Sequence, residues 1–149
     1  MTLQTTLYRL FERDLTRLKV ELNLYSDEQI IWQTTGQISN TAGNLTLHLL
    51  GNLNTYIGAV LGGTDYVRDR TAEFSLKNIP RESLLEQIDA LLIILKTTLE
   101  KLSDTAFEEE YPLLVLEEKT STAYFLVHLT THLAYHLGQI NYHRRLLDK

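Results

Sequence analysis

Two histidines four residues apart, His132 and His136, are the residues of this chain best suited to chemistry. They lie inside a long stretch with a helical pattern, and residues i and i+4 of a helix share one face. Two neutral imidazoles placed in this way can bind one transition-metal ion, so the spacing recurs in helical zinc sites. The spacing also occurs by chance, and a buried histidine is more often a hydrogen-bonded core residue than a ligand. The pair alone leaves both interpretations open.

The pair belongs to a longer polar stripe. At about 100° per residue, five polar side chains fall within a sector of roughly 80°, namely His128, His132, His136, Gln139 and His143. Apolar residues border this sector on one side, so the histidines are predicted to lie at the edge of a buried face. The only other histidine, His48, lies in a second helical segment and completes a possible three-histidine site. Three protein ligands with an open position are typical of catalytic zinc, whereas structural sites have four.

The chain lacks the glutamate base of a helical zinc protease. The residue after His132 is Leu133, where those enzymes have glutamate. No Asp or Glu occurs between Lys119 and Asp148. A general base would therefore come from another helix or from a bound water.

Two asparagines flank His48 at helical spacing. Asn44 and Asn52 lie four residues before and after it, so they share its face. Either amide could orient the site or hydrogen-bond a ligand. Packing of both amides in the core is the alternative.

Two arginines offer a second kind of binding group. Arg68 and Arg70 lie in a polar connection and could hold an anionic ligand group as hydrogen-bond donors. The alternative is a surface ion-pair network with Asp69 and Glu73.

Four amphipathic helices are predicted to position these residues. The apolar residues recur with helical period over approximately 4–24, 41–61, 80–102 and 121–147. With almost no strand signal, this pattern predicts an all-α fold, a four-helix bundle in one domain over residues 1–149.

Two segments interrupt the helical pattern. A long polar connection, 64–79, follows the second helix, and such links often cross over the end of a bundle. An irregular segment, 103–119, precedes the fourth helix and contains Pro112 and two acidic runs. Within it, the apolar residues 113–116 are predicted to form a short extended piece or a lid.

Composition excludes several classes of function. The chain has no cysteine, which excludes disulfides, thiolate metal sites and a cysteine nucleophile. A net charge of −5 argues against a nucleic-acid partner, which requires a basic face. No signal peptide is visible, and no aliphatic run approaches the about 20 residues that span a bilayer. We therefore expect a cytoplasmic protein without a membrane segment.

Several short motifs together resemble the DinB-like superfamily of helical proteins, in particular a branch of small bacterial proteins of uncharacterised function. The similarity is clearest over residues 40–145, and the last of its motifs is the most specific. The motifs are Asn44-Leu45, His48-Leu49, Gly51-Asn52-Leu53, Arg68-Asp69-Arg70, Ala72-Glu73-Phe74 and the run from His132 to Ile140.

This resemblance implies a four-helix bundle that binds a divalent ion, nickel or zinc, through His48, His132 and His136. It also implies frequent homodimers, and relatives that act as transferases or isomerases with a low-molecular-weight thiol cofactor. His128, one turn before the pair, is a further candidate for contact with the metal or ligand. His143 is predicted near the mouth of the site or at the surface.

Two functions are therefore carried forward. The first is a metal-dependent enzyme, a thiol S-transferase or a hydrolase, acting on a small-molecule substrate. Its three-ligand site and the nearby arginines favour it. The second is a non-catalytic metal- or ligand-binding protein that works as a dimer, which the absence of a visible base favours.

Overall fold

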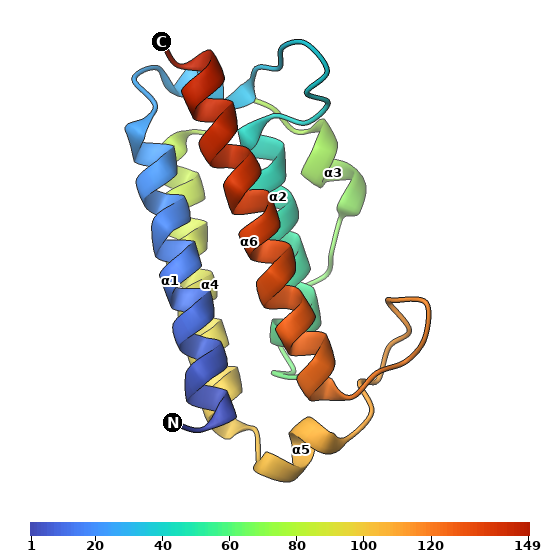
Figure 1. Cartoon of the computed structure of the whole chain (residues 1–149). Coiled ribbons are helices and arrows are strands. Elements are labelled where there is room, and N and C mark those ends of the chain that lie inside the picture. Colours follow the sequence, from blue (N-terminus) through green and yellow to red (C-terminus); the bar gives the residue numbers. More distant parts are fainter.

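The computed structural model describes residues 1–149, and its regular secondary structure is entirely helical. The all-α prediction is confirmed. Four long helices lie side by side (Figure 1): α1 (Leu3–Leu24), α2 (Ala42–Leu53), α4 (Arg81–Lys101) and α6 (Thr122–Leu147). The shorter elements are η1 (Glu28–Trp32), η2 (Asn54–Ala59), α3 (Arg70–Ser75) and α5 (Asp104–Glu108).

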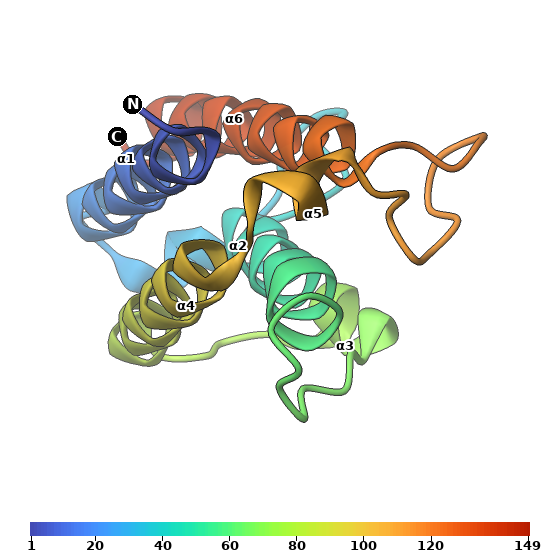
Figure 2. The same ribbon diagram turned by 90° about the horizontal axis from the view of Figure 1, so that it is seen from below.

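The long helices form a ring when viewed along their length (Figure 2). Helix α1 packs against α4 and α6, and α2 packs against the same two helices from the other side. Helices α1 and α6 run in one direction, whereas α2 and α4 run in the other (Figure 1). Because α2 and α4 are parallel, the chain between them must return along the length of the molecule. This returning connection carries α3, which packs on α2.

Side-chain caps fix where the helices begin. Thr2, Thr41 and Ser121 each accept a hydrogen bond from a backbone N–H in the first turn of α1, α2 and α6. Such a bond satisfies one of the donors that a helix start leaves free. Asp69 does the same for the short helix α3. The helix starts thus follow from local polar residues, whereas the leucine-rich faces determine how the helices pack.

The core is a single cluster of buried apolar side chains contributed by every long helix. Leu15, Leu49, Leu95 and Leu133 are fully buried, one from each of them. Helix α2 is the central element, since all twelve of its residues are buried. A polar residue on α2 is therefore either hydrogen-bonded inside the protein or faces an internal site.

The structure differs from the sequence prediction at three places. The second helix changes after Leu53 into the π-helical segment η2, in which Val60 N–H donates to Thr55 O at 3.0 Å. The returning connection contains α3, and the segment before α6 contains α5. Residues 113–116 lie in the loop before α6 (Figure 2), and most of them are exposed, although Val115 borders a cavity between α2 and α6 and Leu116 packs against the core. None of the helices combines the length and apolar character needed to cross a membrane.

Candidate metal centre

Three histidines from two helices come together, with His48 buried and His132 and His136 half-buried. His48 lies on α2, and His132 and His136 lie one turn apart on α6. His132 Nε2 is 3.2 Å from His48 Nε2 and 3.2 Å from His136 Nε2. One ligand atom from each imidazole lies within 4.8 Å of the other two. The packing of α2 on α6 thus produces the three-histidine cluster that the sequence predicted.

Hydrogen bonds on the far side of two rings fix which nitrogen faces the cluster. His48 Nδ1 is 3.1 Å from Glu73 Oε1, and His136 Nδ1 is 2.7 Å from Gln139 Oε1. Carboxylate and amide oxygens accept hydrogen bonds, so the tautomer with a hydrogen on each Nδ1 and a lone pair on each Nε2 satisfies both contacts. His132 Nε2 has one hydrogen at most, and it cannot satisfy both lone pairs.

The donor set therefore fits a metal ion. Nitrogens bound at about 2.0–2.1 Å to one tetrahedral ion lie about 3.3 Å apart. The two separations of 3.2 Å are close to this value. A cation bound between the rings satisfies all three lone pairs together, whereas a single shared hydrogen leaves one nitrogen unpaired. The chain could thus hold an ion with three neutral imidazoles.

Burial lowers the pKa of two of the three imidazoles. The pKa of His132 is lowered to about 4, first by burial and then by the neighbouring imidazoles of His136, His48 and His128. The pKa of His48 is also lowered, again first by burial, although its hydrogen bond to Glu73 acts in the opposite direction. Since a metal binds only the unprotonated ring, both shifts favour metal binding at neutral pH.

Glu73 is a residue next to the histidine cluster that the sequence prediction did not assign to the site. It is buried on α3 and accepts from His48 through Oε1, while Arg68 Nε donates to its Oε2 at 2.8 Å. Arg68 Nη2 also donates to Oε1, at 3.0 Å. A carboxylate behind a ligand histidine fixes the ring and raises its basicity. Arg68, a candidate for binding an anionic ligand, is thus engaged in holding this carboxylate.

Gly51 makes room for the carboxylate. A side chain at this position would begin with a Cβ only 2.7 Å from Glu73 Cδ, and still closer to Glu73 Oε2. That separation is shorter than real Cβ contacts. The glycine inside α2 costs about 1 kcal/mol relative to alanine. It permits the close approach of α3 that places Glu73 behind His48.

The two asparagines on α2 have different environments. Asn44 Nδ2 donates to two backbone carbonyls of the returning connection, those of Glu73 and Leu76, each at 2.9 Å. Its side chain therefore fastens α3 to α2. Asn52 is also buried, but its Oδ1 has no hydrogen-bond partner.

A cavity of about 210 Å³ borders the histidine cluster. His48 and His132 form part of its wall, and so does His128, which stacks on Phe125 rather than joining the three close nitrogens. The ring centroids of His128 and His132 are 6.4 Å apart. Asn52, Arg68 and Arg70 also line this cavity. The structure thus brings six of the predicted site residues around one space, whereas Asn44 and His136 do not line it.

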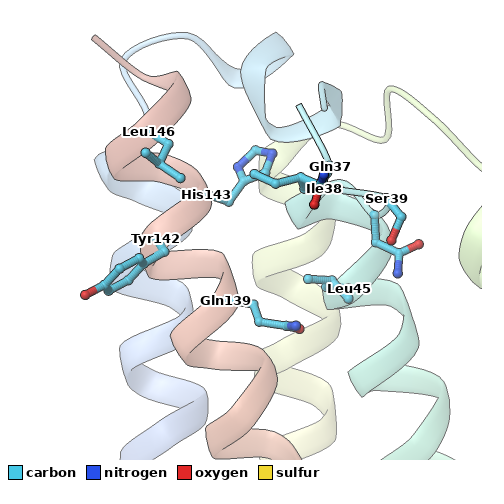
Figure 3. Close-up of a pocket in the computed structure, with 9 residues that line it drawn as sticks. Gln37, Ile38, Ser39, Leu45, Gln139, Tyr142, His143 and Leu146 are labelled. Atoms are coloured by element: carbon cyan, nitrogen blue, oxygen red, sulfur yellow. The ribbon is translucent and has the colours of Figure 1, made fainter. Parts of the chain in front are cut away.

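His143 was predicted near the mouth of the site or at the surface, and its burial shows that the surface position is wrong. The residue is 2% exposed, and Figure 3 shows its ring directed from α6 towards the segment that carries Gln37 and Ile38. Tyr25 OH is 2.7 Å from Nδ1, and Nε2 donates to Gln33 O at 2.7 Å. The segment after α1 covers this end of α6, which the periodicity of α6 alone does not reveal.

A second cavity, of about 360 Å³, lies at this end of the molecule (Figure 3). His143 and Gln139 both line it, and Gln139 is also the residue that holds His136. This cavity therefore lies next to the hydrogen bond between Gln139 and His136. None of the three histidines of the cluster lines it.

The family of the chain follows from a comparison with protein-family models. Residues 6–149 match the family model DUF1572, whose description is "protein of unknown function". The chain belongs to this family. A comparison with curated proteins gave no match. The DUF1572 match spans every residue of the histidine cluster and of its surrounding hydrogen bonds, but its description assigns no activity.

Proposed function

We propose that this DUF1572 protein is a metal-dependent enzyme. In the proposal, His48, His132 and His136 hold one divalent ion, nickel or zinc. The enzyme catalyses transfer to or from a small thiol, or a hydrolysis. The observation that carries the proposal is the convergence of three imidazole nitrogens, two of which have their other ring nitrogen already hydrogen-bonded.

The residues around the ligands support an open, reactive site. A divalent ion held by three neutral ligands lowers the pKa of a bound water or thiol and polarises a carbonyl. Glu73 and Gln139 hold the rings of His48 and His136 in place. His128 is a titratable group of the cavity wall outside the three-histidine group, and it is placed to accept or return a proton.

The thiol part of the proposal rests on the resemblance to the DinB-like superfamily. We propose that the ring of α1, α4, α2 and α6 is the four-helix bundle of that superfamily. The motifs around His48 and His132 support this relationship. A low-molecular-weight thiol is then the proposed cofactor, and its sulfur takes the position left open by the three histidines.

A non-catalytic metal- or ligand-binding role is the second candidate, and one observation favours it. Glu73, the acidic residue closest to the ligands, is committed to Arg68 and His48. No Asp or Glu lines the cavity beside the cluster. If His128 does not transfer protons, the cavity offers no other side-chain base.

Turnover experiments separate the two candidates. Nickel- and zinc-loaded protein is assayed with a panel of electrophiles and esters, each with and without small thiols. We expect turnover that disappears in His132→Ala and falls in His128→Ala while the latter keeps its metal. Absence of turnover with every member of the panel in fully loaded protein contradicts the enzyme and favours the binding role.

We also propose that the protein forms a homodimer through the outer face of α6. This face exposes Tyr124, Val127, Tyr135 and Tyr142, and no charged residue occurs between Lys119 and Arg144. The ends of the face differ in charge, since acidic residues precede α6 and Arg145 lies over Tyr142 at its C-terminal end. Antiparallel pairing of two α6 helices would cover the aromatic side chains and bring opposite charges together.

A further inference from the structure

The cavity beside the histidine cluster is bordered by one arginine, Arg70, whose positive charge is not neutralised by another protein group. Two arginines line it, and Arg68 is bonded to Glu73 through both Nε and Nη2. Arg70 makes no ion pair and no side-chain hydrogen bond, although it begins α3 at the edge of the same cavity. No carboxylate lines the space. The free guanidinium therefore favours an anion at the mouth.

The same cavity contains an unsatisfied acceptor. Asn52 is 6% exposed, and its Oδ1 has no hydrogen-bond partner. A buried polar group without a partner costs about 1–3 kcal/mol, so such groups are normally bonded to protein, water or ligand. Asn52 lies one turn after His48, on the face that points into the cavity. A ligand that donates an N–H or O–H here would satisfy it.

The remaining wall limits the size and character of the ligand. Phe125 and Leu129 supply apolar surface from α6. The cavity volume of about 210 Å³ is small, and a small organic acid suits such a space. In the metal-free cavity, a single free arginine also suits the one charge of a carboxylate better than the larger charge of a phosphate.

We infer that this cavity binds a small carboxylate that carries a hydroxyl or amine, with the carboxylate on Arg70 and the donor on Asn52 Oδ1. The inference names the substrate class of the proposed enzyme and so rests on the proposed function. It separates the roles of the two arginines, because Arg70 holds the ligand while Arg68 holds Glu73.

Calorimetric titration of the full chain tests the inference. The probes are 2-hydroxybutyrate, 2-aminobutyrate, butyrate and inorganic phosphate, added to zinc-loaded and to metal-free protein. We expect the hydroxy and amino acids to bind more tightly than butyrate, because butyrate leaves Asn52 Oδ1 unpaired. Phosphate should bind at least tenfold more weakly than 2-hydroxybutyrate. The preference for the hydroxy acid over butyrate should disappear in Asn52→Leu.

Arg70→Gln is the decisive variant, and Arg9→Gln, an exposed arginine on α1, is its matched control. Loss of a charge-assisted hydrogen bond is expected to weaken 2-hydroxybutyrate binding about tenfold or more in Arg70→Gln. The control should bind as wild type does, and both variants should keep the wild-type zinc content. Equal binding of 2-hydroxybutyrate to wild type and Arg70→Gln overturns the inference. So does the absence of binding to both zinc-loaded and metal-free protein.

Zinc content distinguishes this failure from a failure of the proposed function. Wild-type protein that takes up no stoichiometric ion contradicts the metal centre. Arg70-dependent binding to the metal-free protein would still support the carboxylate site. Stoichiometric zinc without Arg70-dependent binding contradicts the carboxylate site alone, and tighter binding of phosphate than of any carboxylate contradicts the assigned ligand class.

Discussion

Glu73 Oε1 lies 3.1 Å from Nδ1 of His48, so a carboxylate on the returning connection holds the ring of a histidine on α2. The two residues are 25 positions apart. The contact exists because α2 and α4 are parallel and the chain between them lies on α2. The topology of the fold, rather than any local motif, supplies the outer layer of the candidate metal centre.

The three-histidine assignment predicts how metal content responds to substitution. His136→Ala should lose stoichiometric metal, because two ligands bind far more weakly than three. His128→Ala, its matched control on the same helix, should keep one ion, since that ring lies outside the close group. Elemental analysis after dialysis measures both. A full equivalent of ion in His136→Ala would show that the ligand assignment is wrong.

Glu73 predicts a change in affinity without a change in ligands. The hydrogen bond from His48 to Glu73 holds the imidazole ring and makes its Nε2 more basic. Glu73→Gln keeps the shape of the side chain but weakens this hydrogen bond. Loss of such a partner typically costs 10–100-fold, so we expect zinc affinity to fall by about that factor. Arg68→Gln should have a smaller effect in the same direction. Competition with a chelator of known affinity provides the measurement, and unchanged affinity in Glu73→Gln would contradict the role.

The close packing of Glu73 against Gly51 predicts that a methyl group added at Gly51 lowers the affinity for zinc, although it does not touch the metal ligands. In Gly51→Ala the new Cβ occupies space now held by the Glu73 carboxylate, so the contact with His48 must lengthen. Gly138→Ala is the control, because a Cβ there meets no atom within 4 Å. We expect lower zinc affinity in Gly51→Ala alone. Equal affinity in the two variants would mean that the carboxylate position is unimportant.

Burial of the imidazoles predicts how the metal-free protein responds to acid. The pKa of His132 is lowered to about 4, and the pKa of His143 is also lowered by burial. The unfolded chain takes up protons below about pH 6.5, whereas the folded chain resists protonation at these rings. The free energy of unfolding should therefore be highest above about pH 6.5 and should decrease as the pH falls towards 4.

Urea unfolding of chelator-treated protein between pH 7.5 and 4.5 measures this effect. His132→Leu should show a shallower pH dependence, because the unfolded chain then takes up about one proton fewer. His128→Leu, on the same helix, is the control for the effect of replacing a histidine by leucine. A wild-type stability that stays constant or rises over this range would contradict the prediction.

The exposed face of α6 predicts self-association. Light scattering at micromolar concentration should give twice the 17.2 kDa mass of one chain. Tyr135→Asp places a charge at the centre of the proposed interface and should shift the protein to the monomer. Val67→Asp, at an exposed position outside α6, should leave the mass unchanged. A wild-type mass of 17.2 kDa would contradict the dimer.

Local signals in the sequence account for most of the helix boundaries. The prediction of helices over 4–24 and 121–147 agrees with α1 and α6 to within one residue at each end. Periodic leucines and capping residues, both of which act over a few positions, determine these limits. The short helix α3 was missed, because six residues contain too little of a helical period to be recognised.

The candidate site was predictable only for the histidines, because the chain has few of them and few could be metal ligands. Three histidines could be grouped from the i, i+4 pair together with the one histidine on another helix. The roles of Glu73 and Arg68 depend on contact between α3 and α2, and their sequence is equally compatible with a surface ion pair. The burial of His143 depends on a segment that covers the end of α6. Such contacts arise from the tertiary fold and leave no periodic pattern.

The two closest ligand atoms from different helices belong to His48 and His132, which are 84 residues apart. In an unfolded chain, closing a loop of that length costs about 4.5 kcal/mol in entropy. In the folded chain, packing of the hydrophobic core brings these residues together. A divalent ion should therefore act as a reversible cross-link in a chain that has no cysteine, with a preference of about three orders of magnitude for the folded state. Metal occupancy would then report on the integrity of the whole fold.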